Sequence, residues 1–237
     1  MEPIPEDWQR GLVIVAHPDD IEYGAAAAVA RWTDQGKDIR YVLVTSGEAG
    51  IAGLNPRQCG PLREDEERAS AAVVGVTEVE FLGYPDGTVE YGPQLRMDLA
   101  RVIRQHRPEM VVTANFRETW GPGVLNSADH RAVGLAVLDA VADAANEWIF
   151  PELVEPPWTG ARWAAVNAMV GITHAVDVTA TVERAVRSLC EHNAYLTALS
   201  AEPVLEQAAR QIEMATAPRP GFDAERAVGF ELYVFGG

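Results

Sequence analysis

Short apolar runs alternate with amphipathic segments along the first 150 residues of the chain. Short runs rich in β-branched residues are typical of strands buried in a parallel sheet. The chain has such runs at residues 12–16, 39–45, 79–84 and 110–114. Apolar residues at helical spacing predict helices at residues 21–35, 62–74, 95–107 and 128–148. This alternation of strand and helix predicts an α/β fold with a mostly parallel sheet and right-handed crossovers.

The rest of the chain carries further elements behind a proline-rich stretch at residues 150–160. We expect a strand at residues 164–171 that extends toward residue 179, helices at 181–201 and 204–216, and a last strand at 226–235 on an edge of the sheet. The chain is expected to form one domain over residues 1–237, with a core at 11–150 and a C-terminal part at 160–237.

Composition narrows the classes of partner. The net charge is −16, and Lys37 is the only lysine of the chain, which disfavours a nucleic-acid or anionic membrane surface as partner. No apolar run is long enough to predict a membrane span. The acidic, proline-rich N-terminus does not resemble a secretory signal, so we expect a cytoplasmic protein. Cys59 and Cys190 lie too far apart for a Cys-x-x-Cys metal pair and fit no disulfide framework.

The first apolar run ends abruptly in His17, Pro18, Asp19 and Asp20. In open α/β sheets, ligands bind at the carboxyl ends of the strands. The sequence therefore puts two potential metal ligands and a potential base where this architecture builds its sites. The alternative is an ordinary junction, in which an aspartate caps the next helix and binds nothing.

A second polar pair, Asp129 and His130, opens the helix that follows the fourth predicted strand. Both polar stretches are then expected at the same edge of the sheet, as a shared metal site requires. His130 is a candidate ligand, and Asp129 is a candidate partner for a nearby imidazole. The alternative is that Asp129 caps the helix and His130 is an ordinary surface residue.

Together these stretches resemble the PIG-L/LmbE family of zinc-dependent N-deacetylases. The matching features are AHPDD at residues 16–20, the Arg63-Glu64-x-Glu66 region, LGYPDG at residues 82–87, Asp129-His130, and a C-terminal part with residues 174–179 and a helix containing His192. The resemblance covers nearly the whole chain. It implies a Rossmann-like three-layer α/β sandwich with a mostly parallel sheet and a C-terminal strand and helix extension.

The resemblance also implies the site. His17, Asp20 and His130 would hold Zn²⁺, and Asp19 would be the general base. Two imidazoles and one carboxylate make an open zinc site with room for a water, whose pKa zinc lowers to about 7. The implied function is a hydrolase that removes an N-acyl group, in the first place acetyl, from an amino sugar or a related small amide. The partner is that small N-acylated substrate, and the family resemblance permits a homo-oligomer.

One departure from the family pattern bears on the mechanism. The second family motif usually reads His-x-Asp-His, whereas this chain has Ser127 at the first position. Serine cannot act as a charged acid, and Asp129 loses the partner that it would orient. Three interpretations stay open: another group such as His174 supplies the acid, Asp19 moves the proton in both directions, or the chain is a catalytically weak member that binds a small molecule. Asp19, Asp129 and His174 are thus the candidate catalytic residues.

Arg63 and Asp86 match family positions near the substrate, where they would bind sugar hydroxyls, and Ser127 is a third candidate contact. A salt bridge at a helix start and a turn-forming aspartate are equally good explanations of Arg63 and Asp86. Amide cleavage in a thiol conjugate is a second enzymatic interpretation. A dinucleotide-binding protein is disfavoured, because no Gly-x-Gly-x-x-Gly follows the first strand.

Overall fold

A computed structural model describes residues 1–235, over which the chain forms ten strands and seven helices. The strands are β1 (Glu2–Pro3), β2 (Arg10–Val15), β3 (Asp38–Thr45), β4 (Glu78–Tyr84), β5 (Met110–Ala114), β6 (Thr119–Gly121), β7 (Val124–Leu125), β8 (Trp163–Asn167), β9 (His174–Asp177) and β10 (Ala227–Val234). The helices are α1 (Ala26–Asp34), α2 (Pro56–Val73), α3 (Pro93–His106), α4 (Ala128–Ala145), α5 (Val182–Cys190), α6 (Asn193–Leu199) and α7 (Val204–Ala215).

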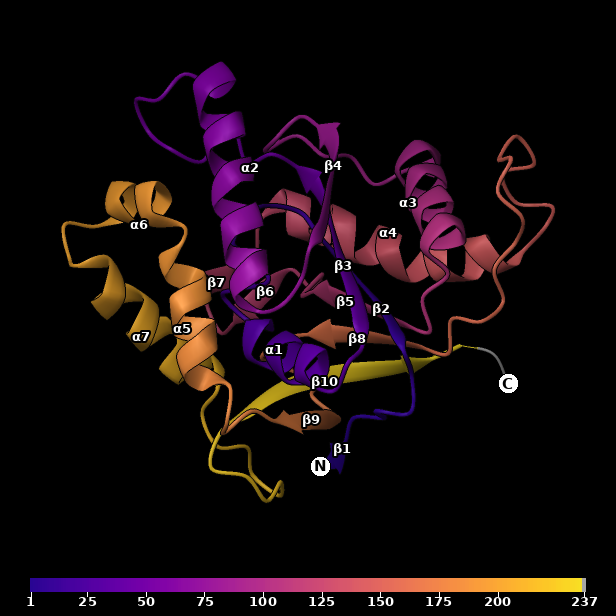
Figure 1. The fold of residues 1–237 in the computed structure, drawn as a ribbon. Coiled ribbons are helices and arrows are strands. Elements are labelled where there is room, and N and C mark those ends of the chain that lie inside the picture. The colour runs from indigo at the N-terminus through magenta and orange to yellow at the C-terminus, as the bar shows by residue number, and fades with distance from the viewer. Residues whose placement is uncertain (236–237) are drawn as a thin grey trace.

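Eight of the strands described in residues 1–235 form one sheet in the order β1-β9-β10-β8-β5-β2-β3-β4 (Figure 1). Its neighbouring strands are parallel except for β10, which is antiparallel to both β8 and β9. The α/β class and the mostly parallel sheet are therefore confirmed. The expectation that the last strand lies at an edge is wrong, because β10 lies inside the sheet, where Ala227–Phe230 are buried.

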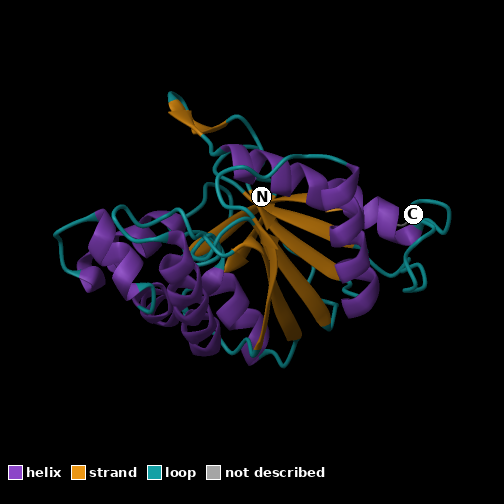
Figure 2. Ribbon diagram, turned by 90° about the horizontal axis from the view of Figure 1, so that it is seen from above, coloured by secondary structure: helices purple, strands orange, loops and turns teal. Residues whose placement is uncertain are grey.

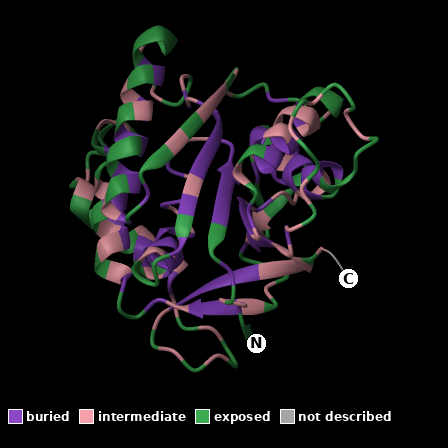
Figure 3. Ribbon diagram, turned by 45° about the vertical axis from the view of Figure 1, so that its right-hand side comes forward, coloured by how far each residue is buried: buried purple, intermediate pink, exposed green. Residues whose placement is uncertain are grey.

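Helices cover both faces of this sheet, which gives the three layers seen in Figure 2. Side chains of a strand alternate between the two faces. Val13 and Val15 of β2 join a core with residues of α1, α2, α5, α6 and α7, whereas Leu12 and Ile14 join a second core with residues of α3 and α4. The central strands are mostly buried, and the exposed positions lie on the outer helices, the loops and edge strands such as β4 (Figure 3).

Three expected helix boundaries were wrong. The helix after β2 begins at Ala26, because residues 18–25 form irregular turns in which Asp20 accepts hydrogen bonds from the amides of Ala16 and His17 and caps no helix. Helix α2 begins at Pro56, before the expected start at residue 62, because the Asn55 side chain caps it. The expected helix at residues 181–201 is two helices, α5 and α6, which are separated at His192.

The order of the strands determines which polar side chains lie close together. Strands β2 and β5 are parallel neighbours, so the segments that follow them leave the sheet at the same edge. The first segment carries His17 to Asp20, and the second leads to His130 at the start of α4. Within the described part of the chain, no helix is both long enough and apolar enough to span a bilayer.

Candidate active site

The structure brings His17, Asp20 and His130 together at this edge. His17 Nδ1 and His130 Nε2 are 3.1 Å apart, and His130 Nε2 lies 2.8 Å from Asp20 Oδ1. Asp20 Oδ2 lies 3.6 Å from His17 Nδ1. Three potential ligand atoms from two segments more than a hundred residues apart thus converge on one point, as the sequence analysis expected.

The protonation of His130 is fixed by its outer neighbour. The Asn126 amide donates to the carbonyls of Asn115 and Arg117, so its oxygen must face the ring. That oxygen lies 2.8 Å from His130 Nδ1, which therefore carries the proton. His130 Nε2 is then left with a lone pair that points at Asp20 and His17.

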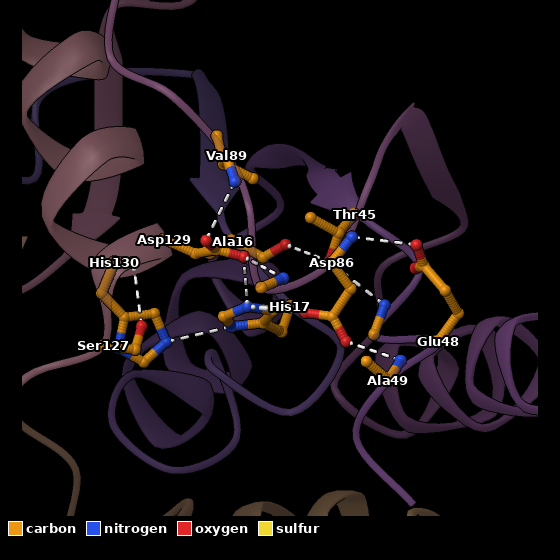
Figure 4. A network of polar contacts seen from close by, with 12 residues as sticks. Ala16, His17, Thr45, Glu48, Ala49, Asp86, Val89, Ser127, Asp129 and His130 are labelled. Carbon is orange, nitrogen blue, oxygen red and sulfur yellow. Dashed lines mark hydrogen bonds and ion pairs between the residues drawn. The ribbon is translucent and has the colours of Figure 1, made fainter. Parts of the chain in front are cut away.

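The same holds for His17, which lies between His130 and two carboxylates (Figure 4). Its Nε2 is 3.2 Å from Asp129 Oδ2 and 3.1 Å from Asp86 Oδ1, so Nε2 donates to these carboxylates and Nδ1 is the ring nitrogen directed at His130 and Asp20. Asp129 also accepts from the amides of Gly87 and Val89, and Asp86 accepts from the amide of Ala49. Asp129 therefore holds the imidazole of His17, a candidate metal ligand.

This donor set fits a divalent metal ion. Two imidazole nitrogens and a carboxylate oxygen face one another, as the ligands of a cation do. Tetrahedral ligands of zinc lie roughly 3.3 Å apart, close to the spacings observed. Burial alone would lower the pKa of His17, but the carboxylates of Asp129, Asp20 and Asp86 raise it to about 12, so a metal ion would bind there by displacing a proton from the ring. Burial likewise opposes ionisation of Asp20, but the two imidazoles hold its pKa below the usual range.

Replacing Asp129 should weaken the site without removing a ligand. An Asp129→Ala variant removes one of the two carboxylates beside His17 Nε2 and leaves the amides of Gly87 and Val89 without their acceptor, so we expect metal affinity to fall about 10- to 100-fold. Titration of the metal-free protein with a competing chelator measures this affinity. Asp139→Ala on the same helix is the control, because Asp139 contacts Tyr91 and not His17. Equal metal affinity in the two variants would contradict the orienting role of Asp129.

Asp19 lies beside this cluster and is almost fully buried. Its carboxylate is 3.1 Å from Arg63 Nη2, and Arg63 also donates to the carbonyls of Gly47 and Pro18. The Arg63 guanidinium lies on the ring of Tyr195, with 4.0 Å to the ring centroid. Burial raises the pKa of Asp19 to about 6, although Arg63 opposes the shift. Arg63 is thus committed to Asp19 and to backbone oxygens, in keeping with the salt-bridge alternative.

The remaining candidate residues are placed as follows. Asp86 contacts His17 and lies within the site. Ser127 is the N-cap of α4, where its hydroxyl accepts from the amide of His130, so the helix is capped by Ser127 and not by Asp129. His174 lies on β9, four strands away from β2, and its ring contacts Thr173 and Glu2. The expectation that His174 supplies an acid is therefore wrong, because the strand order holds it away from the site.

A pocket of about 290 Å³ opens beside Asp20. Its walls are mainly apolar and come from the turn after β2, the hairpin β6–β7, the end of β8 and helix α7. They include Tyr23, Trp120, Met169, Gln211 and Met214. Trp120 also packs edge-on against His130, with ring centroids 5.5 Å apart, so the pocket reaches the candidate metal ligands.

A buried cluster that no motif of the sequence predicts lies behind Asp19. Glu22, Glu67 and His192 are fully buried, and His192 Nε2 lies 3.4 Å from Glu22 Oε2 and 3.6 Å from Glu67 Oε2. Burial alone would lower the pKa of His192, but the carboxylates of Glu22 and Glu67 raise it to about 9. No local spacing in the chain marks this cluster, because its members come from the turn after β2, from α2 and from the start of α6.

Comparison with known proteins supports a family. The sequence model of the PIG-L family, described as GlcNAc-PI de-N-acetylase, matches residues 12–141. The chain is 31% identical over 140 residues to a diacetylchitobiose deacetylase of Thermococcus kodakarensis, covering 58% of this chain and 51% of that protein. It is 30% identical over 171 residues to a 1D-myo-inositol 2-acetamido-2-deoxy-alpha-D-glucopyranoside deacetylase of Saccharopolyspora erythraea, covering 61% of each. The chain thus spans only about half to three fifths of the length of these curated relatives.

Solved structures share the fold. The N,N'-diacetylchitobiose deacetylase of Pyrococcus horikoshii superposes with a TM-score of 0.85 at 22% identity, over 97% of this chain and 85% of that one. GalB of Pseudomonas putida, a 4-carboxy-2-hydroxymuconate hydratase, superposes with a TM-score of 0.72 at 18% identity, over 94% of this chain and 95% of that one. Because a deacetylase and a hydratase share this fold, the reaction has to be argued from the residues of the site.

Proposed function

This chain belongs to the PIG-L family, and from that membership and its site we propose that it is a zinc-dependent N-deacetylase of amino sugars or related small amides. The observation that carries the proposal is the convergence of His17 Nδ1, His130 Nε2 and Asp20 on one point. Asn126 and Asp129 orient the two rings so that His130 Nε2 and His17 Nδ1 face Asp20, an arrangement suited to a cation. The relatives' names, which describe deacetylases of N-acetylated amino sugars, support the class of reaction.

Each residue of the site has a role in the proposed reaction. His17, Asp20 and His130 would hold the zinc ion, which when bound lowers the pKa of water and polarises the amide carbonyl. Asp19 accepts the proton of the attacking water, and it is kept in place by Arg63. In the absence of a histidine at position 127, Asp19 also returns the proton to the leaving amine, because His174 lies elsewhere.

The surroundings suggest how the substrate lies. Asp86 lies on one side of His17, where the loop after β3 holds it through Glu48 and the amide of Ala49. The pocket beside Asp20 lies next to His130 and is larger and more apolar than an acetyl group needs. We propose that the polar side binds sugar hydroxyls and that the pocket takes the apolar part of the substrate.

A second candidate function is a catalytically weak member that binds a small molecule. The observation that favours it is Ser127, which the structure uses as a helix cap and which offers no acid to the site. Retained ligand binding without turnover of N-acetyl substrates would support this alternative.

The test is acetate release from a panel of N-acetyl amino sugars, with the free amine measured in parallel. We expect release that a chelator abolishes and added zinc restores. An N-acetylated thiol conjugate in the same panel distinguishes deacetylation of amino sugars from amide cleavage in a thiol conjugate. Absence of acetate and amine with every substrate, from protein that holds metal, would contradict the proposed function.

A further inference from the structure

Asp19 has a backbone conformation that non-glycine residues rarely adopt. Its φ angle is +90°, in the region that favours glycine. Such a residue persists only where its surroundings over-determine the conformation. The groups that hold Asp19 therefore decide where its carboxylate lies.

Helix α2 holds Asp19 at two points. Arg63 Nη2 lies 3.1 Å from Asp19 Oδ1, and Glu67 Oε2 accepts a hydrogen bond of 3.1 Å from the Asp19 backbone amide. Arg63 and Glu67 are four residues apart, so they lie on the same face of the helix. One helix thus fixes both the side chain and the backbone of the same residue.

Glu67 is itself held in a dry environment. Its side chain is fully buried, with His192 Nε2 at 3.6 Å from Oε2, and His192 lies at the start of α6. Among the described residues, Glu67 Oε1 has no hydrogen-bond partner. A buried carboxylate that leaves one oxygen unused is a costly way to stabilise a fold, and such a group calls for an explanation.

We propose that Glu67 is a positioning residue that holds the candidate base Asp19 through its backbone amide. The proposal rests on the proposed function only in that Asp19 is the base. Glu67 touches neither the ligand triad nor the pocket, so its loss should act on catalysis through the placement of Asp19.

The experiment compares Glu67→Met, which removes the acceptor, with Glu67→Gln, whose amide oxygen can still accept from Asp19. We expect Glu67→Met to lower kcat about 10- to 100-fold, since a small misplacement of a reacting group has effects of that size. KM and bound metal should stay within about twofold of wild type, and Glu67→Gln should recover most of kcat. Glu66→Met is the matched control, because Glu66 lies on the same helix and accepts from the amide of Ala194 on α6.

A second measurement separates this proposal from the proposed function. Hydrogen exchange at the Asp19 amide, measured without substrate, should be slow in the wild type and in Glu67→Gln and fast in Glu67→Met. If no substrate is turned over, the proposed function fails. Slow exchange of the Asp19 amide would still support the hydrogen bond by which Glu67 positions Asp19. Fast exchange in the wild type, or wild-type kcat in a folded Glu67→Met protein, would overturn the proposal. An equal loss of kcat in Glu66→Met and Glu67→Met that follows thermal stability would overturn it too.

Discussion

An Asp19→Asn variant should bind metal like the wild type and lose nearly all activity. Asparagine keeps the shape of the side chain and an oxygen for Arg63, but it cannot accept the proton of the attacking water. General base catalysis contributes about 10²- to 10⁴-fold, so we expect kcat to fall by roughly 10³-fold. The measurement is kcat for acetate release together with bound metal in the same preparation.

The control for this variant is Asp177→Asn, an equivalent change on β9 whose carboxylate accepts from Thr179. It should leave kcat and bound metal unchanged. The role of Asp19 as base would be contradicted by an Asp19→Asn protein that keeps its metal and about a tenth or more of the wild-type kcat.

A His192→Leu variant should lose much of its stability. The change removes the imidazole that lies beside the buried carboxylates of Glu22 and Glu67 and leaves two buried carboxylates close together. Breaking a buried ion pair by removing one partner costs about 3–5 kcal/mol. For a chain of this size, the free energy of unfolding falls enough to lower Tm by roughly 10 °C. Thermal unfolding at pH 7 measures the loss.

The same histidine predicts a pH dependence with a definite sign. The pKa of His192 is raised to about 9 in the folded chain, above the value of about 6.5 expected in the unfolded chain. Its contribution to stability is therefore fully present below about pH 6.5 and is lost as the pH rises through about 9. The wild type should lose stability between these pH values, and His192→Leu should lose less over the same range. His174→Leu, a matched change on β9, should show the wild-type slope, and an identical slope in His192→Leu would contradict the charged state of His192.

Much of the fold follows from local pattern. Strands β2, β3, β4 and β5 and helices α3 and α4 lie within a few residues of their predicted bounds, because their apolar periodicity matches the faces that they bury. The turn after β2 could not be predicted in this way. Its backbone follows long-range and polar contacts, such as the bond from the Asp19 amide to Glu67, and these override the helical pattern of residues 21–25.

Some residues of the site could likewise be predicted from the sequence, and others could not. The positions of His17, Asp20 and His130 follow from motifs at the ends of two strands, and strand adjacency brings them together. The place of His174 could not be predicted, because the order of β8, β9 and β10 is a property of the whole sheet. Glu67 and Asn126 act through single contacts with Asp19 and His130, and no local pattern of the chain marks such contacts.

The most direct test of the proposed metal site measures bound zinc in the wild type, in His130→Ala and in His174→Ala. Each protein is purified without a metal-binding tag. We expect about one zinc ion per chain in the wild type and in His174→Ala, and little or none in His130→Ala. That result would join the two distant segments into one metal site. Equal zinc in all three proteins, or no metal in the wild type under conditions that supply it, would contradict a metal centre built from His17, Asp20 and His130.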